Sequence, residues 1–225
     1  MESKGLWLYR SSAFCVDSEE SGSGPARKIK IPLLHTRDPP NTLVKVAIKY
    51  VSKDEEHEEM EVDGQGLLPL DVSLMTQVNS APACPNVLQL MYWFDYPGRY
   101  ICTEFCEGND SLDESQAKKV LVQLINALKH CESRRVFHQE VKPQNLLICT
   151  DSHKTKLLDF GCGHTGTFSA DFFLFLGLSG TLSYTPPEWF PSHSYRGGPA
   201  TVWSLGVTLY NLLCGSLTFR STWRV

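Results

Sequence analysis

A run of β-branched residues from Leu43 to Val51 is the feature that most constrains how this chain can fold. Within it Val44, Val46 and Ile48 occupy every second position, and two lysines lie on the other side of the alternation. This two-residue period is typical of a β-strand with one apolar and one polar face. The run therefore predicts a strand at residues 43–51.

Strands are expected early in the chain and helices later. Apolar, β-branched stretches predict strands at residues 87–94 and 99–104, which turn at Tyr96-Pro97-Gly98. Helical periodicity predicts a short helix at residues 69–78 and a longer one at 112–130. The residues expected to face the core in the longer helix are Leu121, Leu124, Ile125 and Leu128. This order predicts an α+β fold, with a small β-rich lobe followed by a mostly helical lobe.

Two segments lack a clear periodic pattern. Residues 1–42 carry Ser21-Gly22-Ser23-Gly24-Pro25 and Asp38-Pro39-Pro40, which is turn and loop composition and predicts a poorly ordered leader. The acidic run from Asp54 to Glu61 predicts a solvated loop or helix face, with a patch for basic partners as the alternative.

Charge and composition argue against two classes of partner. The chain has 21 Lys and Arg against 25 Asp and Glu, so it has no broad positive field with which to hold nucleic acid or an anionic membrane. Its longest apolar run, Phe172 to Leu176, is far shorter than the roughly 20 residues that cross a bilayer.

The eight cysteines are scattered without a C-x-x-C pair, which predicts reduced thiols and no metal site. We expect a cytoplasmic protein, with the nucleus as a second compartment left open.

Three short motifs carry the residue types that phosphoryl transfer needs. Val46-Ala47-Ile48-Lys49 ends in a lysine that can reach the phosphates of ATP from a strand. Residues 138–145, His-Gln-Glu-Val-Lys-Pro-Gln-Asn, have the spacing of a catalytic loop that carries a base and a metal ligand. Asp159-Phe160-Gly161 supplies a carboxylate for the metal that bridges the phosphates. Each motif alone is weak, but their order and spacing together indicate a protein kinase.

Two later segments extend the likeness. Pro186-Pro187-Glu188-Trp189 and Thr201 to Val207 follow in the order of kinase segments, the second at the start of the central buried helix. The chain thus resembles a serine/threonine protein kinase catalytic domain and, within that class, the Pim family as its fish members carry it. The segments that carry the likeness to Pim kinases are Ala47–Lys53, Leu68–Val72, Cys84–Val87, Trp93–Asp95, Asp159–Gly163, Tyr184–Trp189 and Val202–Gly206.

The resemblance implies a bilobal kinase fold and a function. It places a leader at residues 1–42, an N-terminal lobe at 43–103, and a hinge with a truncated C-terminal lobe at 104–225. It further implies ATP and magnesium as cofactors and serine or threonine hydroxyls of proteins as acceptors.

The resemblance also assigns residues to the cofactor. Lys49 would bind the α- and β-phosphates, and Asp71 would pair with Lys49 in place of the usual Glu. Glu104 and Cys106 would form the hinge beside adenine, where Cys106 restores an N–H donor that the Pim hinge proline lacks.

The same likeness assigns the residues of the reaction itself. Glu140 stands at the catalytic base, and Lys142 two residues later is the mark of serine/threonine kinases, a class that Thr181 also fits. Asn145 and Asp159 would hold magnesium.

Several positions depart from the family pattern. Glu140 replaces an Asp and moves the carboxylate about one carbon along a rigid loop, where a misplacement of about 1 Å can cost about a hundredfold in rate. Gln139 replaces an Arg, and Pro143 and Gln144 replace acidic residues with which Pim kinases read basic substrates.

Other departures concern whole segments. No glycine-rich loop precedes Lys49, since Gly22 and Gly24 have another spacing and no flanking strand is expected. The helix that follows the hinge in Pim kinases is missing before Leu112, and the later helices of the large lobe, which carry the Arg partner expected for Glu188, are missing as well. We therefore expect an incomplete C-terminal lobe whose central helix exposes apolar surface, and a partner chain as one possible cover.

The sequence leaves three readings open. The first is a weakly active serine/threonine kinase. The second is a pseudokinase that acts as a nucleotide-binding or protein-interaction module, and the third is an inactive fragment.

Overall fold

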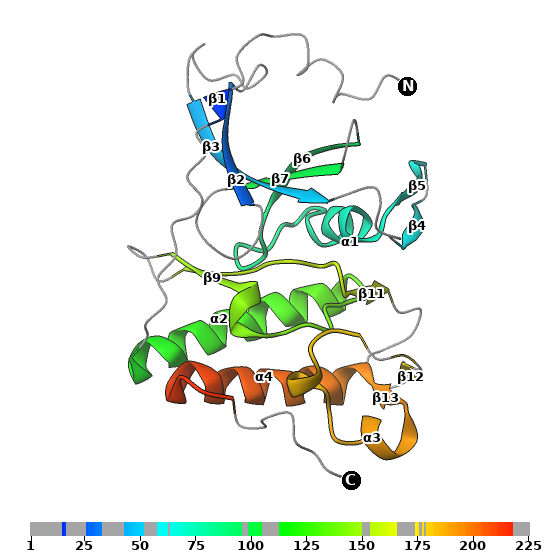
Figure 1. Cartoon of the computed structure of the whole chain (residues 1–225), viewed down its shortest axis with the longest axis vertical. Coiled ribbons are helices and arrows are strands. Elements are labelled where there is room, and N and C mark those ends of the chain that lie inside the picture. Colours follow the sequence, from blue (N-terminus) through cyan, green and yellow to red (C-terminus); the bar gives the residue numbers. More distant parts are fainter. Residues whose placement is uncertain are drawn as a thin grey trace. The chain divides into compact units, whose positions relative to one another are not determined.

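The computed structural model describes residues 15–16, 26–32, 43–51, 58–62, 64–95, 99–104, 113–149, 154–165, 174–175, 177 and 179–217. The chain divides into two compact units, one of residues 1–58 and 89–105 and one of residues 59–88 and 106–225 (Figure 1). The first unit contains a sheet, and all helices of the described ranges lie in the second. This is the predicted mixture of a small strand-rich part and a helical part.

The first unit is built on one antiparallel sheet. Its strands are β1 (Cys15–Val16), β2 (Ala26–Pro32), β3 (Leu43–Val51), β6 (Leu90–Asp95) and β7 (Arg99–Glu104). They lie in the order β1-β2-β3-β7-β6, so that β3 is central. The predicted strands at residues 43–51 and 99–104 are confirmed, and the strand expected at residues 87–94 begins three residues later.

Residues 1–42, for which the composition predicted a leader of turns and loops, contain two strands. Strand β2 pairs along its whole length with β3, from Pro32 opposite Leu43 to Ala26 opposite Lys49, and β1 pairs with β2. A signal was present, because Ile29 and Ile31 alternate with lysines, but the alternation is short. Gly22 and Gly24 lie between β1 and β2, outside the described residues, so the statement that no strand flanks them is also wrong.

The second unit begins with a hairpin and a short helix. The elements are β4 (Glu59–Val62), β5 (Gly66–Pro69) and α1 (Leu70–Val78). Glu58, Glu59 and Glu61 are exposed, as expected of the acidic run. Its last three residues, 59–61, belong to strand β4, which pairs with β5, so the loop or helix predicted there is wrong at these residues; residues 54–57 lie outside the described residues. Helix α1 confirms the helix predicted at residues 69–78.

Helix α1 is attached to the helical unit by backbone carbonyls. The Gln77 amide donates to the carbonyl oxygen of Arg134 at 2.6 Å, and His130 Nε2 lies 2.8 Å from that of Val78. Residues 59–88 therefore group with the helices, although the predicted N-terminal lobe, residues 43–103, included them. The lobe boundaries themselves stay a prediction.

The remaining elements of the second unit surround two long helices. They are α2 (Glu114–Ser133), β8 (Val136–Phe137), η2 (Pro143–Asn145), β9 (Leu146–Ile148), β10 (Thr155–Leu157), β11 (His164–Thr165), β12 (Leu174–Phe175), η3 (Leu182–Tyr184), α3 (Trp189–Ser192), β13 (Tyr195–Arg196) and α4 (Gly197–Cys214). None of the helices within the described ranges is long and apolar enough to cross a membrane.

Helix α2 confirms the long helix but corrects its buried face. Asp113 caps it, because its carboxylate accepts from the Gln116 backbone N–H while the Gln116 side chain accepts from the Asp113 N–H. Of the four residues expected in the core, only Leu124 is fully buried; the other three are half-buried. The buried stripe consists of Ala117, Val120, Leu124, Ala127 and Cys131.

Helix α4 lies beside α2 and contacts η2 (Figure 1). The Thr208 hydroxyl, buried on α4, donates to the carbonyl oxygen of Val141 at 2.9 Å. The helix begins at Gly197, four residues before the segment that predicted it, and only one of its faces is buried. Among the described residues, Val202, Tyr210 and Leu213 of this helix are exposed, while the predicted truncation of the lobe stays a prediction.

The corrected face of α2 can be tested by truncating two leucines. Leu124→Ala should lower the free energy of unfolding by about 2–5 kcal/mol, because Leu124 is 1% exposed and would leave a cavity. Leu121→Ala should lower the free energy of unfolding clearly less, since Leu121 is half-buried. Urea unfolding followed by circular dichroism measures both, with exposed Val122→Ala as the control. Equal decreases in the free energy of unfolding for Leu121→Ala and Leu124→Ala would contradict this orientation of α2.

Candidate active site

Two short strand pairs bring the catalytic-loop motif and the Asp159 motif together. Strand β8 pairs with β11, and β9 pairs with β10, so the loops between these strands run side by side. The backbone N–H of Leu158 also donates to the carbonyl oxygen of Asn145 at 2.9 Å. Residues that lie far apart in the chain thereby meet inside the second unit.

His138 ties the two loops together from the inside. Its Nε2 lies 2.7 Å from the carbonyl oxygen of Leu158, and its Nδ1 accepts from the backbone N–H of Glu140 at 3.3 Å. The ring also packs edge to face against Phe160, with the two ring centroids 4.8 Å apart. Because one ring nitrogen must donate and the other accept, this pair of contacts selects a neutral imidazole with its proton on Nε2.

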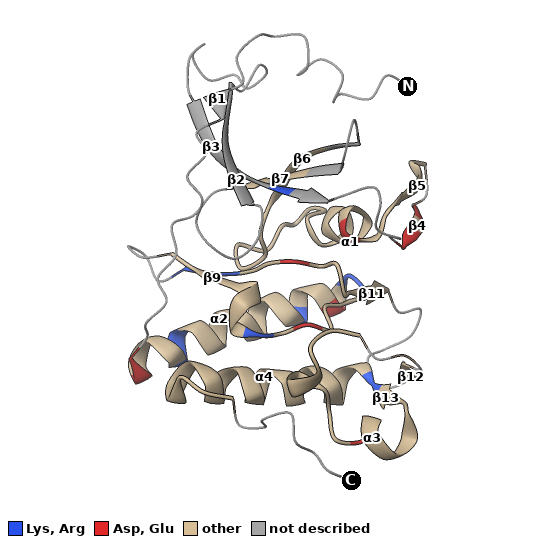
Figure 2. Ribbon diagram, viewed as in Figure 1, with Lys and Arg blue, Asp and Glu red and all other residues tan. Residues whose placement is uncertain are grey.

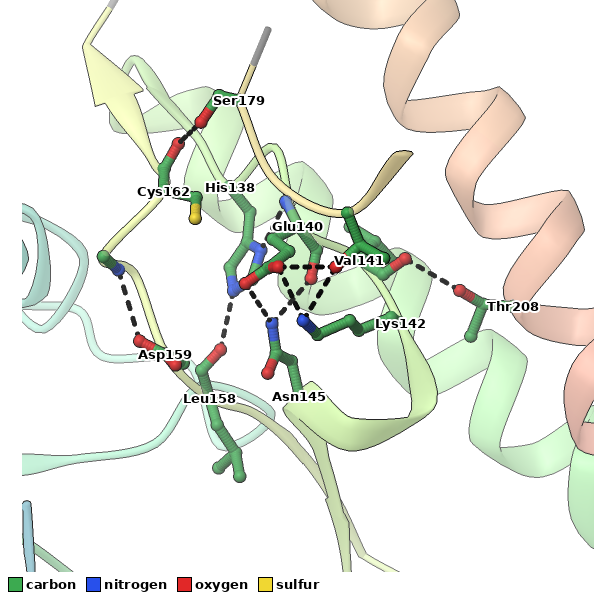
Figure 3. Close-up of polar contacts among 12 residues, drawn as sticks. His138, Glu140, Val141, Lys142, Asn145, Leu158, Asp159, Cys162, Ser179 and Thr208 are labelled. Atoms are coloured by element: carbon green, nitrogen blue, oxygen red, sulfur yellow. Dashed lines mark hydrogen bonds and ion pairs between the residues drawn. The ribbon is translucent and has the colours of Figure 1, made fainter. Parts of the chain in front are cut away.

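The Glu140 carboxylate is held by three side chains (Figure 3). Lys142 Nζ lies 2.6 Å from Oε1, and the Thr181 hydroxyl donates to the same oxygen at 2.8 Å. Asn145 Nδ2 donates to Oε2 at 3.2 Å and to the backbone oxygen of Glu140 at 2.8 Å. Lys142 Nζ further donates to Thr181 at 3.0 Å, which closes the network.

These contacts decide the protonation state of Glu140. Burial by itself raises the pKa of this carboxyl, but the hydrogen bonds from Lys142, Thr181 and Asn145 and the charge of Lys142 outweigh it. The net pKa of Glu140 therefore lies below its ordinary value. The carboxylate is ionised at neutral pH, as a base must be, but its low pKa makes it a weak one.

The loops that carry these groups adopt left-handed backbone conformations. Gln139 has φ 59° and Asp159 has φ 56°, a region that residues with side chains rarely adopt and that clusters at functional sites. Gly180, with φ 81°, allows the segment before Thr181 to approach closely. A Cβ atom there would lie 2.8 Å from the Gln139 carbonyl oxygen. This close approach places the Thr181 hydroxyl on Glu140.

The oxygen donors needed for a magnesium ion are present next to Glu140. Because the Asn145 amide nitrogen points to Glu140, its amide oxygen points the other way. Asp159 follows Leu158 in the chain, and one oxygen of its carboxylate lies 3.4 Å from the backbone nitrogen of Gly161 (Figure 3). Within the described part of the chain no group of three or more His, Cys, Asp or Glu could hold a metal. Two such oxygen ligands fit magnesium, which typically takes one or two carboxylates together with waters and phosphate oxygens.

The residues predicted to bind the nucleotide are not brought together within one unit of the described structure. Lys49 is exposed on β3 in the first unit, and Asp71 lies on α1 in the second, so their pairing stays a prediction. Glu104 ends β7 opposite Val46. Cys106 lies outside the described residues. The four residues predicted for the reaction and the metal, Glu140, Lys142, Asn145 and Asp159, all lie in the second unit.

Two further residues at this site were not predicted from the sequence. Thr208 supports the loop through Val141, as described above. Cys162 lies beside Glu140; burial raises the pKa of its thiol, and the charges of Glu140 and Asp159 raise it further. No spacing in the sequence signals either contact, because the partners come from separate elements.

Comparison with known proteins assigns this fold to a family. The sequence model of the family described as protein kinase domain matches residues 40–224. The chain belongs to the protein kinase domain family. Protein kinases as a class use ATP and magnesium, and several of the relatives, among them the first two reported below, are named serine/threonine-protein kinases.

Three relatives indicate the breadth of the likeness. The chain is 33% identical over 193 residues to serine/threonine-protein kinase pim-2 of Danio rerio, covering 78% of this chain and 61% of that protein. It is 29% identical over 187 residues to serine/threonine-protein kinase prk-2 of Caenorhabditis elegans, covering 78% and 41%. It is 33% identical over 185 residues to CBL-interacting protein kinase 11 of Oryza sativa subsp. japonica, covering 78% and 35%. The chain thus spans less than two thirds of the length of these relatives.

The buried imidazole predicts a pH dependence of stability. Burial lowers the pKa of His138 below its ordinary 6.5, so the unfolded chain binds a proton there that the folded chain does not. Stability is therefore fully present above pH 6.5. It should decrease as the pH falls toward the lower folded pKa, by up to about 1.4 kcal/mol per pH unit.

The variant His138→Gln isolates this effect, because glutamine keeps a donor and an acceptor but does not titrate. We expect it to be less stable near neutral pH and to lose less stability on acidification. Urea unfolding at several pH values from about 7.5 to 5.5 measures how the free energy of unfolding of each protein changes with pH. Parallel curves for the two proteins would show that His138 titrates normally in the fold.

Proposed function

We propose that this chain is a Pim-like serine/threonine kinase domain that binds magnesium-ATP weakly and transfers its γ-phosphoryl group slowly to protein hydroxyls. The observation that carries the proposal is the network in which Lys142, Thr181 and Asn145 hold the Glu140 carboxylate. A carboxylate fixed beside a lysine and an amide has the chemistry to orient an acceptor hydroxyl and receive its proton.

The same network supports slow turnover. Both oxygens of Glu140 already accept hydrogen bonds, so an acceptor hydroxyl has to compete with Lys142, Thr181 or Asn145. The lowered pKa also reduces the tendency of Glu140 to take up a proton. Both effects act against the transition state, in which proton transfer to the base has begun.

Cofactor binding is proposed on the chemistry of three side chains. Asn145 and Asp159 would hold magnesium through oxygen atoms, and Lys49 would bind phosphate oxygens of ATP. Magnesium, when bound, neutralises charge on the phosphates. Glu104 and Cys106 are proposed beside adenine and Asp71 beside Lys49, as the resemblance to Pim kinases implies.

The proposal extends to partners and location. The protein acceptors would carry serine or threonine, and the protein would act in the cytoplasm. Lys142 and Thr181, which touch each other and Glu140, support acceptors of the hydroxyl type. The pseudokinase reading gains no separate support from the described residues.

Nucleotide binding should be weak and should depend on magnesium. Titration with ATP and magnesium should raise the melting midpoint by a few degrees at about ten times Kd, because the ligand binds only the folded state. The rise should be smaller without magnesium and absent in the double variant Lys49→Ala, Asp159→Asn. A control pair with the same charge changes, Lys118→Ala with Glu114→Gln, alters the exposed face of α2 and should behave as wild type. Identical titrations for the wild type and the Lys49, Asp159 variant would reject binding at this site.

Restoring the shorter carboxylate should not by itself produce a competent kinase. In Glu140→Asp the carboxylate retracts by about one carbon, yet Lys142 and Thr181 remain nearby and still compete for it. We expect less than a tenfold gain in phosphate transfer to a basic peptide, measured with radiolabelled ATP. Glu140→Gln, which cannot accept a proton at neutral pH, is the matched control and should abolish transfer. A gain of about a hundredfold or more would show that the position of the base was the main defect.

A further inference from the structure

Strand β12 joins the segment that precedes Thr181 to the strand that precedes α4. Its residue Phe175 lies opposite Tyr195 of β13 in the antiparallel pair. Phe175 is 7% exposed and Tyr195 5%, whereas the neighbouring Leu174 is 53% exposed. The pairing therefore buries two aromatic rings side by side.

The two rings belong to an aromatic cluster. Phe175 stacks on Tyr195 with the ring centroids 5.2 Å apart, and Phe137 and Trp189 each meet one of these rings edge to face. Gly197, the first residue of α4, lies against the cluster, because a Cβ atom there would be 3.0 Å from each of the two phenylalanine rings. Such close packing leaves the ring of Tyr195 little freedom. The hydroxyl at the end of this ring is thereby held in one place.

The Tyr195 hydroxyl bridges two loops of the candidate active site. It donates to the side-chain oxygen of Gln139 at 3.3 Å. Burial raises the pKa of this hydroxyl above its ordinary value, and a hydrogen bond with the backbone of Ser179 lowers it only in part, so the proton stays on at neutral pH. Gln139 directly precedes Glu140, and Ser179 lies two residues before Thr181. Tyr195 therefore connects the two stretches that meet where Thr181 donates to Glu140.

The backbone on both sides of this bridge is left-handed and needs support. Gln139 has φ 59° and Gly180, next to Ser179, has φ 81°. A residue with a side chain keeps such a conformation only where its surroundings fix it. Tyr195 contacts the side chain of Gln139 and the backbone of Ser179, and so supports both stretches at once.

Neutral groups make this attachment. Gln139 is uncharged, and helix α4 has no Lys, Arg, Asp or Glu between Gly197 and Cys214, as Figure 2 shows. Arg196, the charged neighbour of Tyr195, is exposed. Since salt screens interactions between charges, the hydrogen bonds of Tyr195 should not weaken as the ionic strength rises.

We propose that Tyr195 is a positioning residue of the candidate active site: its hydroxyl holds Gln139 and Ser179 so that the Thr181 hydroxyl keeps its hydrogen bond to Glu140. The effect of Tyr195 on phosphoryl transfer rests on the proposed function. The hold on Thr181 does not, because it is a property of the fold whether or not the chain transfers phosphate.

NMR spectroscopy of Thr181 tests this hold without any need for turnover. The three-bond couplings of its methyl carbon to the backbone nitrogen and carbonyl carbon report whether the side chain keeps one rotamer, and Thr181→Ser identifies the signal by removing it. The wild type should give single-rotamer values. Tyr195→Phe, which keeps the ring and loses the hydroxyl, should move the couplings toward the rotamer average. It should also speed hydrogen exchange at the Ser179 N–H by about fivefold or more.

Tyr184→Phe is the matched control. Tyr184 is also a buried tyrosine of this unit, but its hydroxyl accepts from Asn211 of α4 and has no printed bond to either loop of the bridge. This variant should leave the couplings of Thr181 and the exchange at Ser179 as in the wild type. Both tyrosine variants should melt within a few degrees of the wild type, since each loses one hydroxyl and no ring. Couplings that are unchanged in Tyr195→Phe, or that change equally in Tyr184→Phe, would overturn the proposal.

Kinetics tests the effect on the reaction. With radiolabelled ATP, Tyr195→Phe should lower kcat by about tenfold and leave KM for ATP within about twofold, because Thr181 and Glu140 lose their alignment. An unchanged kcat together with averaged couplings would overturn the role of Tyr195 in the reaction. A wild type without turnover would count against the proposed function alone, and the couplings would still decide whether Tyr195 holds Thr181.

Discussion

The arrangement of the candidate active site depends on one buried, neutral histidine. His138 bridges the carbonyl oxygen of Leu158 and the backbone N–H of Glu140 and packs its ring against Phe160. These contacts bind the loop that carries Glu140 to the loop that carries Asp159. An imidazolium would lose the contact with Glu140, since both of its nitrogens would be donors. Burial keeps the ring neutral and thereby keeps the two loops together.

The same region shows how a conservative change of residue alters chemistry. With one methylene more than aspartate, Glu140 reaches Lys142, Thr181 and Asn145 at once. The contacts order the carboxylate and lower its pKa, but they occupy the oxygens that a base needs for its substrate. Order and basicity are therefore opposed at this position, because a carboxylate with a lower pKa is a weaker base.

Much of the fold could be predicted from periodicity and short motifs, and the errors have physical causes. Strand β3 and helix α1 follow local patterns, so they were predicted nearly to the residue. Strand β2 was missed because its alternation is short; long-range pairing with β3 stabilises it. In α2 the stripe of Leu121, Ile125 and Leu128 is as apolar as the buried one, and only packing selects which apolar stripe is covered.

The sequence by itself determined the kinase family, because the motifs that indicate it are local and ordered along the chain. Only the tertiary structure decided that Thr181 and Asn145 hold Glu140 and that Thr208 supports Val141. The physical reason is that such contacts join groups distant in the chain. Their geometry follows from how the helices and loops pack, and no local pattern of residues records it.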